Sequence, residues 1–117
     1  MLRIPGDLEL EQSRTFVVMT TAPAGAAAAG IARALVESRL AACVQVVPGA
    51  TSFYHWQGKL EESAEAVLFI KTTAARLDEL VAKVQSLHPY DLPEVVAMEV
   101  AGGAQDYLQW VRQETRE

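Results

Sequence analysis

The spacing of hydrophobic positions changes several times along the chain, and each spacing predicts an element. An uninterrupted β-branched and apolar run over 15–21 is typical of a strand buried on both faces. Apolar residues then recur at helical spacing over 24–39, where Thr21 is a candidate N-cap and Pro23 suits the first turn. The positions that we expect on the buried face of this helix are Ala27, Ile31, Leu35 and Ser38.

The middle of the chain predicts a long β-hairpin. Strand-forming residues run over 41–56, with a kink at Pro48-Gly49, and again over 59–73, with Gln57-Gly58 as the turn between them. A strand of about 16 residues is roughly 50 Å long, whereas a compact chain of this length has a diameter of roughly 35 Å. The hairpin should therefore overhang its own domain, and we expect it to pair with another chain.

The remaining elements complete an α+β domain. Apolar residues repeat at helical spacing after Thr73, itself a candidate N-cap, and His88-Pro89 ends that helix. The residues that repeat on this apolar face are Leu77, Leu80 or Val81, Val84 and Leu87. A strand follows over 94–100. A last amphipathic helix carries Tyr107 and Trp110, which we expect to face the core. The order βαββαβ with an extra C-terminal helix predicts a ferredoxin-like sandwich.

Length and composition agree with one globular domain, which we assign to 15–117 after a flexible N-terminal tail over 1–14. A net charge of −5 argues against a nucleic-acid partner. The single cysteine, Cys43, excludes an intrachain disulfide and sits among apolar residues as a small hydrophobe would. No apolar run reaches the roughly 18 residues of a membrane helix, and we see no signal peptide, so we expect a cytoplasmic protein.

Five short motifs are unlike generic core sequence. They are LAACV (40–44), PGATS (48–52), FYHWQGKLE (53–61), HPYDLPE (88–94) and YLQW (107–110). In this order and spacing the chain resembles the CutA family, the divalent-cation tolerance proteins, from Phe16 to Trp110. The resemblance implies a homotrimer whose hairpins pair across subunits, an architecture similar to PII signalling proteins, and a link to tolerance of copper and other divalent metals. It implies no catalytic reaction.

The resemblance also indicates where a metal would bind. In copper-binding relatives the proposed ligands are a cysteine before the Thr-Ala-Pro turn and two histidines before Pro-Tyr. The matching positions here are Thr20, Leu87 and His88, so only His88 is the same residue type as the proposed ligand. One imidazole per chain does not build a site. We therefore predict weak binding of Cu²⁺ or another divalent cation, with Glu94, Asp91, His55 or neighbouring subunits completing the shell.

A second candidate site is a cleft between subunits, which the matching positions surround in the family. These positions are Tyr54, Trp56, Lys59, Lys71, Tyr90 and Glu94. The charged residues near the hairpin turn, Lys59, Glu61 and Glu62, are equally typical of a strand edge that faces solvent and binds nothing. One functional hypothesis is a non-enzymatic trimeric module linked to metals. The alternative is a PII-like sensor in which an anionic metabolite meets Lys59 or Lys71. No Ser/His/Asp or Cys/His arrangement is visible, so we do not expect an enzyme.

Overall fold

The structure is a computed structural model that describes residues 10–116, so most of the predicted tail, 1–14, lies outside the described residues. The elements of the described part are, in chain order, β1 (Thr15–Ala22), α2 (Ala26–Glu37), β2 (Cys43–Trp56), β3 (Lys59–Thr73), α3 (Ala74–Leu87), β4 (Val95–Glu99) and α4 (Gln105–Glu114). The predicted βαββαβ order with a further C-terminal helix is confirmed. Between residues 10 and 116 no helix has the length and apolar character needed to cross a membrane.

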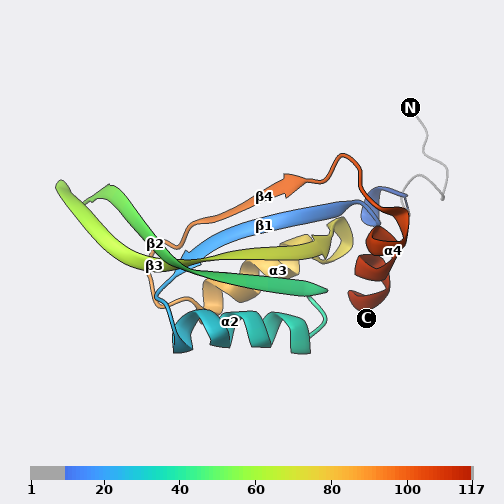
Figure 1. Cartoon of the computed structure of the whole chain (residues 1–117), viewed down its shortest axis with the longest axis horizontal. Coiled ribbons are helices and arrows are strands. Elements are labelled where there is room, and N and C mark those ends of the chain that lie inside the picture. The colour runs from blue at the N-terminus through green and yellow to red at the C-terminus, as the bar shows by residue number, and fades with distance from the viewer. Residues whose placement is uncertain (1–9, 117) are drawn as a thin grey trace.

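Four strands form one antiparallel sheet in the order β2-β3-β1-β4, and α2 and α3 pack on one of its faces (Figure 1). Every second side chain of β1 and β3 points toward these helices. Val18, Leu68 and Ile70 are fully buried there and form one cluster with Leu35 of α2 and Leu80 of α3. This cluster is the hydrophobic core.

The opposite face of the sheet is largely apolar, although Thr21, Gln45 and Lys71 also lie on it. The intervening side chains of the strands lie on it, and α4, which contacts β1 and β3, lies at one end of the sheet (Figure 1). On the edge strand β4, Val96 and Met98 are 45% and 48% exposed, and the corresponding side chains of β1 and β3 are half-buried. We call this surface the open face; its residues are Val17, Met19, Val67, Phe69, Val96 and Met98.

The β2–β3 hairpin projects beyond the rest of the sheet (Figure 1). β1 pairs with β3 only over Ala66–Thr73, so residues 50–56 and 59–65 form a two-stranded ribbon with no third strand beside it. The molecule measures 51 × 31 × 25 Å and its radius of gyration is 15.8 Å, against about 13 Å for a compact chain of this length. The predicted overhang is confirmed.

Two glycine-containing irregularities shape the hairpin where the sequence predicts them. Gln57 and Gly58 in the turn have φ angles of 51° and 81°, the pair of positive values that a tight turn between twisted strands requires. The register of β2 against β3 shifts between Val47 and Ala50, and Gly49 within this bulge has a φ of 89°. The bulge bends the ribbon and redirects the side chains that follow it.

The predicted start of the first helix is wrong. β1 continues through Ala22, which keeps Thr21 in the strand, and α2 begins only at Ala26. Gly25, with a φ of 84°, is the N-cap, and no side chain caps the helix. The backbone thus turns at the glycine, and the carbonyl of Thr21, still within the strand, makes a hydrogen bond described below. Thr73 is the N-cap of α3 as predicted, although its side chain accepts no capping hydrogen bond.

The buried faces of the helices differ from the predicted faces in three places. α2 buries Ile31 and Leu35 as predicted, with Ala28 in place of Ala27 and Ser38. Leu87, at the end of α3, is 41% exposed. On α4, Tyr107 and Trp110 are 43% and 39% exposed, their ring centroids lie 5.6 Å apart, and Val111 is the buried residue. The amphipathic spacing identified the apolar side of α4, but within one chain little covers it.

Candidate functional site

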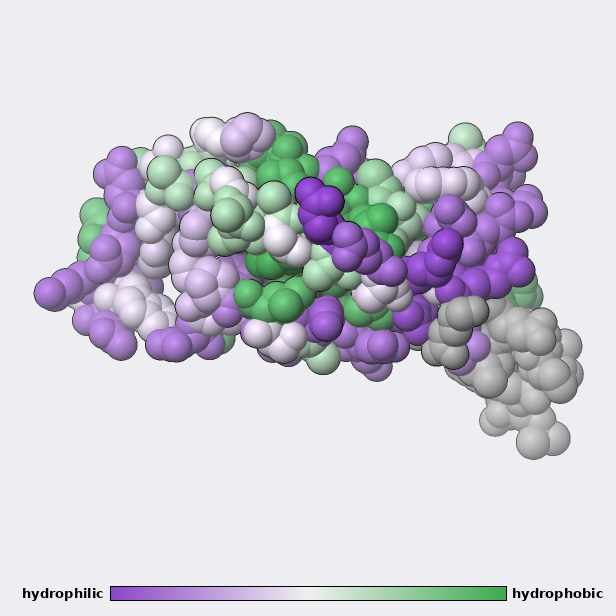
Figure 2. Space-filling view, turned by 90° about the horizontal axis from the view of Figure 1, so that it is seen from below, coloured by the Kyte–Doolittle hydropathy of each residue, from purple (hydrophilic) through white to green (hydrophobic). Residues whose placement is uncertain are grey.

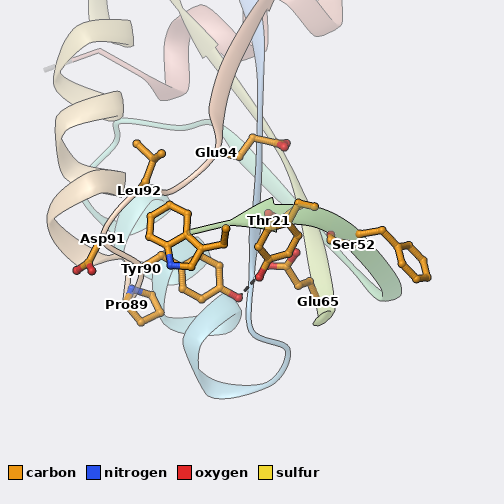
Figure 3. A pocket seen from close by; sticks show the side chains of 11 residues that line it. Thr21, Ser52, Glu65, Pro89, Tyr90, Asp91, Leu92 and Glu94 are labelled. Atoms are coloured by element: carbon orange, nitrogen blue, oxygen red, sulfur yellow. Dashed lines mark hydrogen bonds between the residues drawn. The ribbon is translucent and has the colours of Figure 1, made fainter. Parts of the chain in front are cut away.

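A cavity of about 600 Å³ lies where the projecting hairpin meets the loop between α3 and β4 (Figure 3). We call it the hairpin cavity. Its aromatic residues are Phe53, Tyr54, Trp56 and Tyr90. Its charged residues are Glu65, Asp91 and Glu94, and no lysine or arginine of the described chain lines it. The cavity therefore combines aromatic surface with a negative electrostatic potential.

A hydrogen bond between Tyr90 and Glu65 closes one side of the cavity. The Tyr90 hydroxyl donates to Glu65 Oε2 at 2.8 Å (Figure 3), and Glu65 is only 4% exposed. Strand alternation places Glu65 on the side of β3 opposite its buried neighbour Ala66. Burial, followed by the hydrogen bond and charge of Glu65 and then by Tyr54, raises the pKa of Tyr90 to about 12.

Replacing Glu65 with glutamine is expected to lower the pKa of Tyr90 toward its ordinary value near 10, because the hydrogen bond to a carboxylate and its charge are both removed. In the parent protein the folded state holds the Tyr90 proton more tightly than the unfolded state. This contribution to stability is full below pH 10 and is lost as the pH rises from about 10 to about 12.

Ultraviolet absorbance of the phenolates measures this titration. The Tyr90→Phe variant identifies the signal of Tyr90, because it should lack the tyrosine that ionises at the highest pH. An unchanged highest tyrosine pKa in Glu65→Gln would contradict the assignment of the shift to Glu65.

His88 anchors the loop behind the cavity. Its Nδ1 accepts from the backbone N–H of Tyr90 at 3.2 Å, so the ring proton lies on Nε2, which donates to the Thr21 carbonyl at 2.7 Å. The imidazole is 8% exposed and its ring centroid is 4.7 Å from that of Tyr90. Both nitrogens are thus used within the chain, and a metal would have to displace one of these bonds. The metal-ligand role of His88 stays a prediction.

The other positions matched to family ligands carry no ligand groups. Thr20 is fully buried and its hydroxyl donates to the Glu94 carbonyl at 2.6 Å, while Leu87 is exposed. Cys43 lies opposite Lys71 in the β2–β3 ladder, and His55 is exposed beside the hairpin turn. Within residues 10–116 no group of three or more His, Cys, Asp or Glu side chains is arranged to hold a metal ion.

The structure brings four of the six predicted cleft residues together. Tyr54, Trp56, Tyr90 and Glu94 all line the hairpin cavity. Lys59 pairs with Trp56 at the end of the hairpin but is not part of the lining, and Lys71, at the other end of β3, donates a hydrogen bond to the side chain of Gln45. Whether these six positions surround a cleft between subunits stays a prediction.

The sequence reasoning missed Glu65. A glutamate directly before the apolar run 66–70 is the signal that could have revealed it, because alternation within a strand places it one residue from the core. The sequence could not show that loop 88–94 folds back over it, since that contact joins residues 25 positions apart.

The strand order β2-β3-β1-β4, with two helices on one face, defines the class of ferredoxin-like α+β proteins. Within that class, the family model described as CutA1 divalent ion tolerance protein matches residues 16–114. This chain belongs to the CutA1 family, as the resemblance of its motifs indicated.

Individual relatives agree with the family assignment. The chain is 50% identical over 99 residues to the divalent-cation tolerance protein CutA of Thermus thermophilus, which covers 85% of this chain and 96% of that protein. It is 46% identical over 112 residues to human Protein CutA, covering 96% of this chain and 59% of the human protein. The crystal structure of CutA from Xylella fastidiosa superimposes with a TM-score of 0.86 at 42% identity, over 88% of this chain and 99% of that one.

Proposed function

We propose that this chain is a non-catalytic homotrimeric module of divalent-cation tolerance that acts in the cytoplasm. Family membership supports the link to divalent cations. The observation that carries the proposal is the charge of the hairpin cavity, whose ionisable acidic groups are Glu65, Asp91 and Glu94 without a basic residue in the lining. Such a cavity concentrates cations and repels anions.

The homotrimer is supported by two surfaces that one chain leaves uncovered. The open face is apolar, and the ribbon over 50–56 and 59–65 has unpaired backbone along both edges. Viewed from the side of α2, Figure 2 shows hydrophobic residues gathered across the middle of the molecule; the edge strand beside this helix exposes Val46 and Val47. Copies of the same chain would cover the open face and pair the exposed edges of the ribbon.

We propose weak metal binding with His88 as the ligand from each chain. Its imidazole would have to release Thr21 or Tyr90 before coordinating, which costs about 1 kcal/mol for a lost hydrogen bond. A carboxylate such as Asp91 or Glu94, or a side chain of a neighbouring subunit, would complete the shell. The affinity is expected to be low for two reasons. His88 must first give up an internal hydrogen bond, and the remaining ligands come from weaker carboxylates or from other chains.

Copper titration followed by electron paramagnetic resonance tests this role. The chain contains only two histidines, so His88→Ala and His55→Ala form a matched pair. We expect nitrogen coupling in the Cu²⁺ spectrum that disappears in His88→Ala and persists in His55→Ala, with circular dichroism checking that both variants fold. A spectrum unchanged by His88→Ala would remove His88 from the site.

The alternative, a PII-like sensor of an anionic metabolite, has less support from this chain. Lys59 and Lys71, its proposed anion-binding residues, lie outside the lining of the hairpin cavity. Under this alternative, nucleotides would raise the melting temperature of the protein and Lys71→Ala would abolish the effect. We expect no such rise.

A further inference from the structure

We propose that the hairpin cavity binds a primary organic ammonium ion whose apolar body packs against the aromatic wall. This ligand class is distinct from a divalent metal, and its binding does not depend on His88. Three observations on the cavity lead to it: a buried carboxylate, a set of aromatic rings, and a volume suited to a small organic molecule.

The buried carboxylate needs a cationic partner. Glu65 is 4% exposed, yet it takes no part in the ion pairs seen within residues 10–116, such as Arg14 with Glu99 and Arg39 with Glu114. Among residues 10–116, its side chain is hydrogen-bonded to the neutral Tyr90 hydroxyl alone. Burying a carboxylate is costly unless it is paired. A cation entering the cavity would supply that partner, and Asp91 and Glu94 would add to the attraction.

The aromatic wall favours a cation with an organic body. Tyr54, Trp56 and Tyr90 line the same cavity as Glu65, and Figure 3 shows Tyr90 reaching from the loop toward this carboxylate. Aromatic faces attract ammonium groups through their negative quadrupole. Pro89 and Leu92 add apolar lining. The cavity of about 600 Å³ lies within the usual range for sites that enclose small organic molecules.

The hydrogen bonding around Glu65 favours a primary ammonium over other cations. The planar guanidinium fork pairs best with both oxygens of a carboxylate, but Tyr90 already donates to Oε2. An ammonium group can donate a single N–H to the remaining oxygen, which a quaternary ammonium cannot do. A bare metal ion needs several ligands at once, and residues 10–116 of one chain hold no group of three or more His, Cys, Asp or Glu side chains arranged for it.

Calorimetric titration of the assembled full-length protein with phenethylamine at neutral pH, in the presence of a chelator, tests the proposal. Phenethyl alcohol is the neutral analogue of the same shape, and phenethylguanidine and phenethyltrimethylammonium change only the cationic head. We expect the amine to bind at least tenfold more tightly than the alcohol, and more tightly than either other cation. The absence of binding by the amine, or equal binding of amine and alcohol, would overturn the proposal.

Two variants locate the site. Glu65→Gln should weaken amine binding by about tenfold to a hundredfold, as expected for the loss of a hydrogen bond to a charged group. Trp56→Leu, at an exposed position of the hairpin, should weaken it by about threefold to tenfold. Glu37→Gln, on the exposed side of α2, is the matched control and should leave binding unchanged.

Unchanged amine affinity in both cavity variants would place the amine elsewhere and refute the proposal. Because the chelator removes free metal, this result leaves the copper experiment on His88 unaffected.

Discussion

Phe69→Asp is expected to convert the assembled protein into folded monomers. Phe69 lies on the open face between Met19 of β1 and Gln45 of β2, so its side chain points away from the core. A carboxylate there would be carried into the proposed interface between copies, at an effective cost of several kcal/mol for each ion that is left unpaired. Lys71, two residues along the same face, already donates to the side chain of Gln45. In the monomer the same carboxylate stays in water, and the core remains intact. Sedimentation velocity measures the change.

Val36→Asp is the matched control for this prediction. Val36 is a 42% exposed valine on α2, which packs on the other face of the sheet. Introducing the same charge there should leave the assembly unchanged. A Phe69→Asp protein that sediments like the parent would show that the open face is not an interface.

Leu68→Ala should destabilise the protein by about 2–5 kcal/mol. Leu68 is adjacent to Phe69 but points to the opposite face, where it is fully buried in the cluster formed with α2 and α3. Truncation removes buried apolar surface and leaves a cavity that the surrounding helices fill only in part. Denaturant unfolding at one fixed protomer concentration measures the loss, since assembly makes stability depend on concentration.

Val36→Ala again supplies the control, because a surface truncation should change stability by no more than about 0.5 kcal/mol. The two neighbouring substitutions on β3 should also have different effects. Leu68→Ala lowers the free energy of unfolding, whereas Phe69→Asp lowers the mass of the particle. A Leu68→Ala loss below about 1 kcal/mol would contradict the assignment of this side chain to the core.

The hairpin was the part of the fold that the sequence predicted best. The bounds of β3, the turn at Gln57-Gly58 and the bulge at Pro48-Gly49 all follow from local signals, namely uninterrupted strand formers, residues that accept positive φ, and a proline that cannot join the ladder. Such signals act between neighbours in the chain. They need no knowledge of what packs against them.

The wrong predictions concern burial, which depends on tertiary contacts that the local sequence pattern does not specify. Tyr107 and Trp110 were expected in the core because they share a helix face, but a periodic pattern identifies the apolar face and not what covers it. The same holds for the apolar runs of β1 and β3. The run over 15–21 predicts a strand buried on both faces, whereas the helices of this chain cover only one face of β1 and its side chains on the other face are half-buried.

The candidate site was predicted in part for a related reason. The resemblance to the family singles out Tyr54, Trp56, Tyr90 and Glu94, and these residues meet in one cavity. Glu65 was not recognised, since a glutamate in a strand is ordinary until a distant tyrosine buries it. Its importance depends on the α3–β4 loop folding over the hairpin, a tertiary contact.

The most direct test of the proposed assembly is the native mass of the unmodified protein, measured by sedimentation equilibrium at micromolar protomer concentration. The exposed ribbon and the open face predict association of several copies, and the proposed trimer is three times as heavy as the 12.7 kDa chain. A stable species of one chain mass across the whole concentration range would contradict it, because both surfaces would then remain in contact with water.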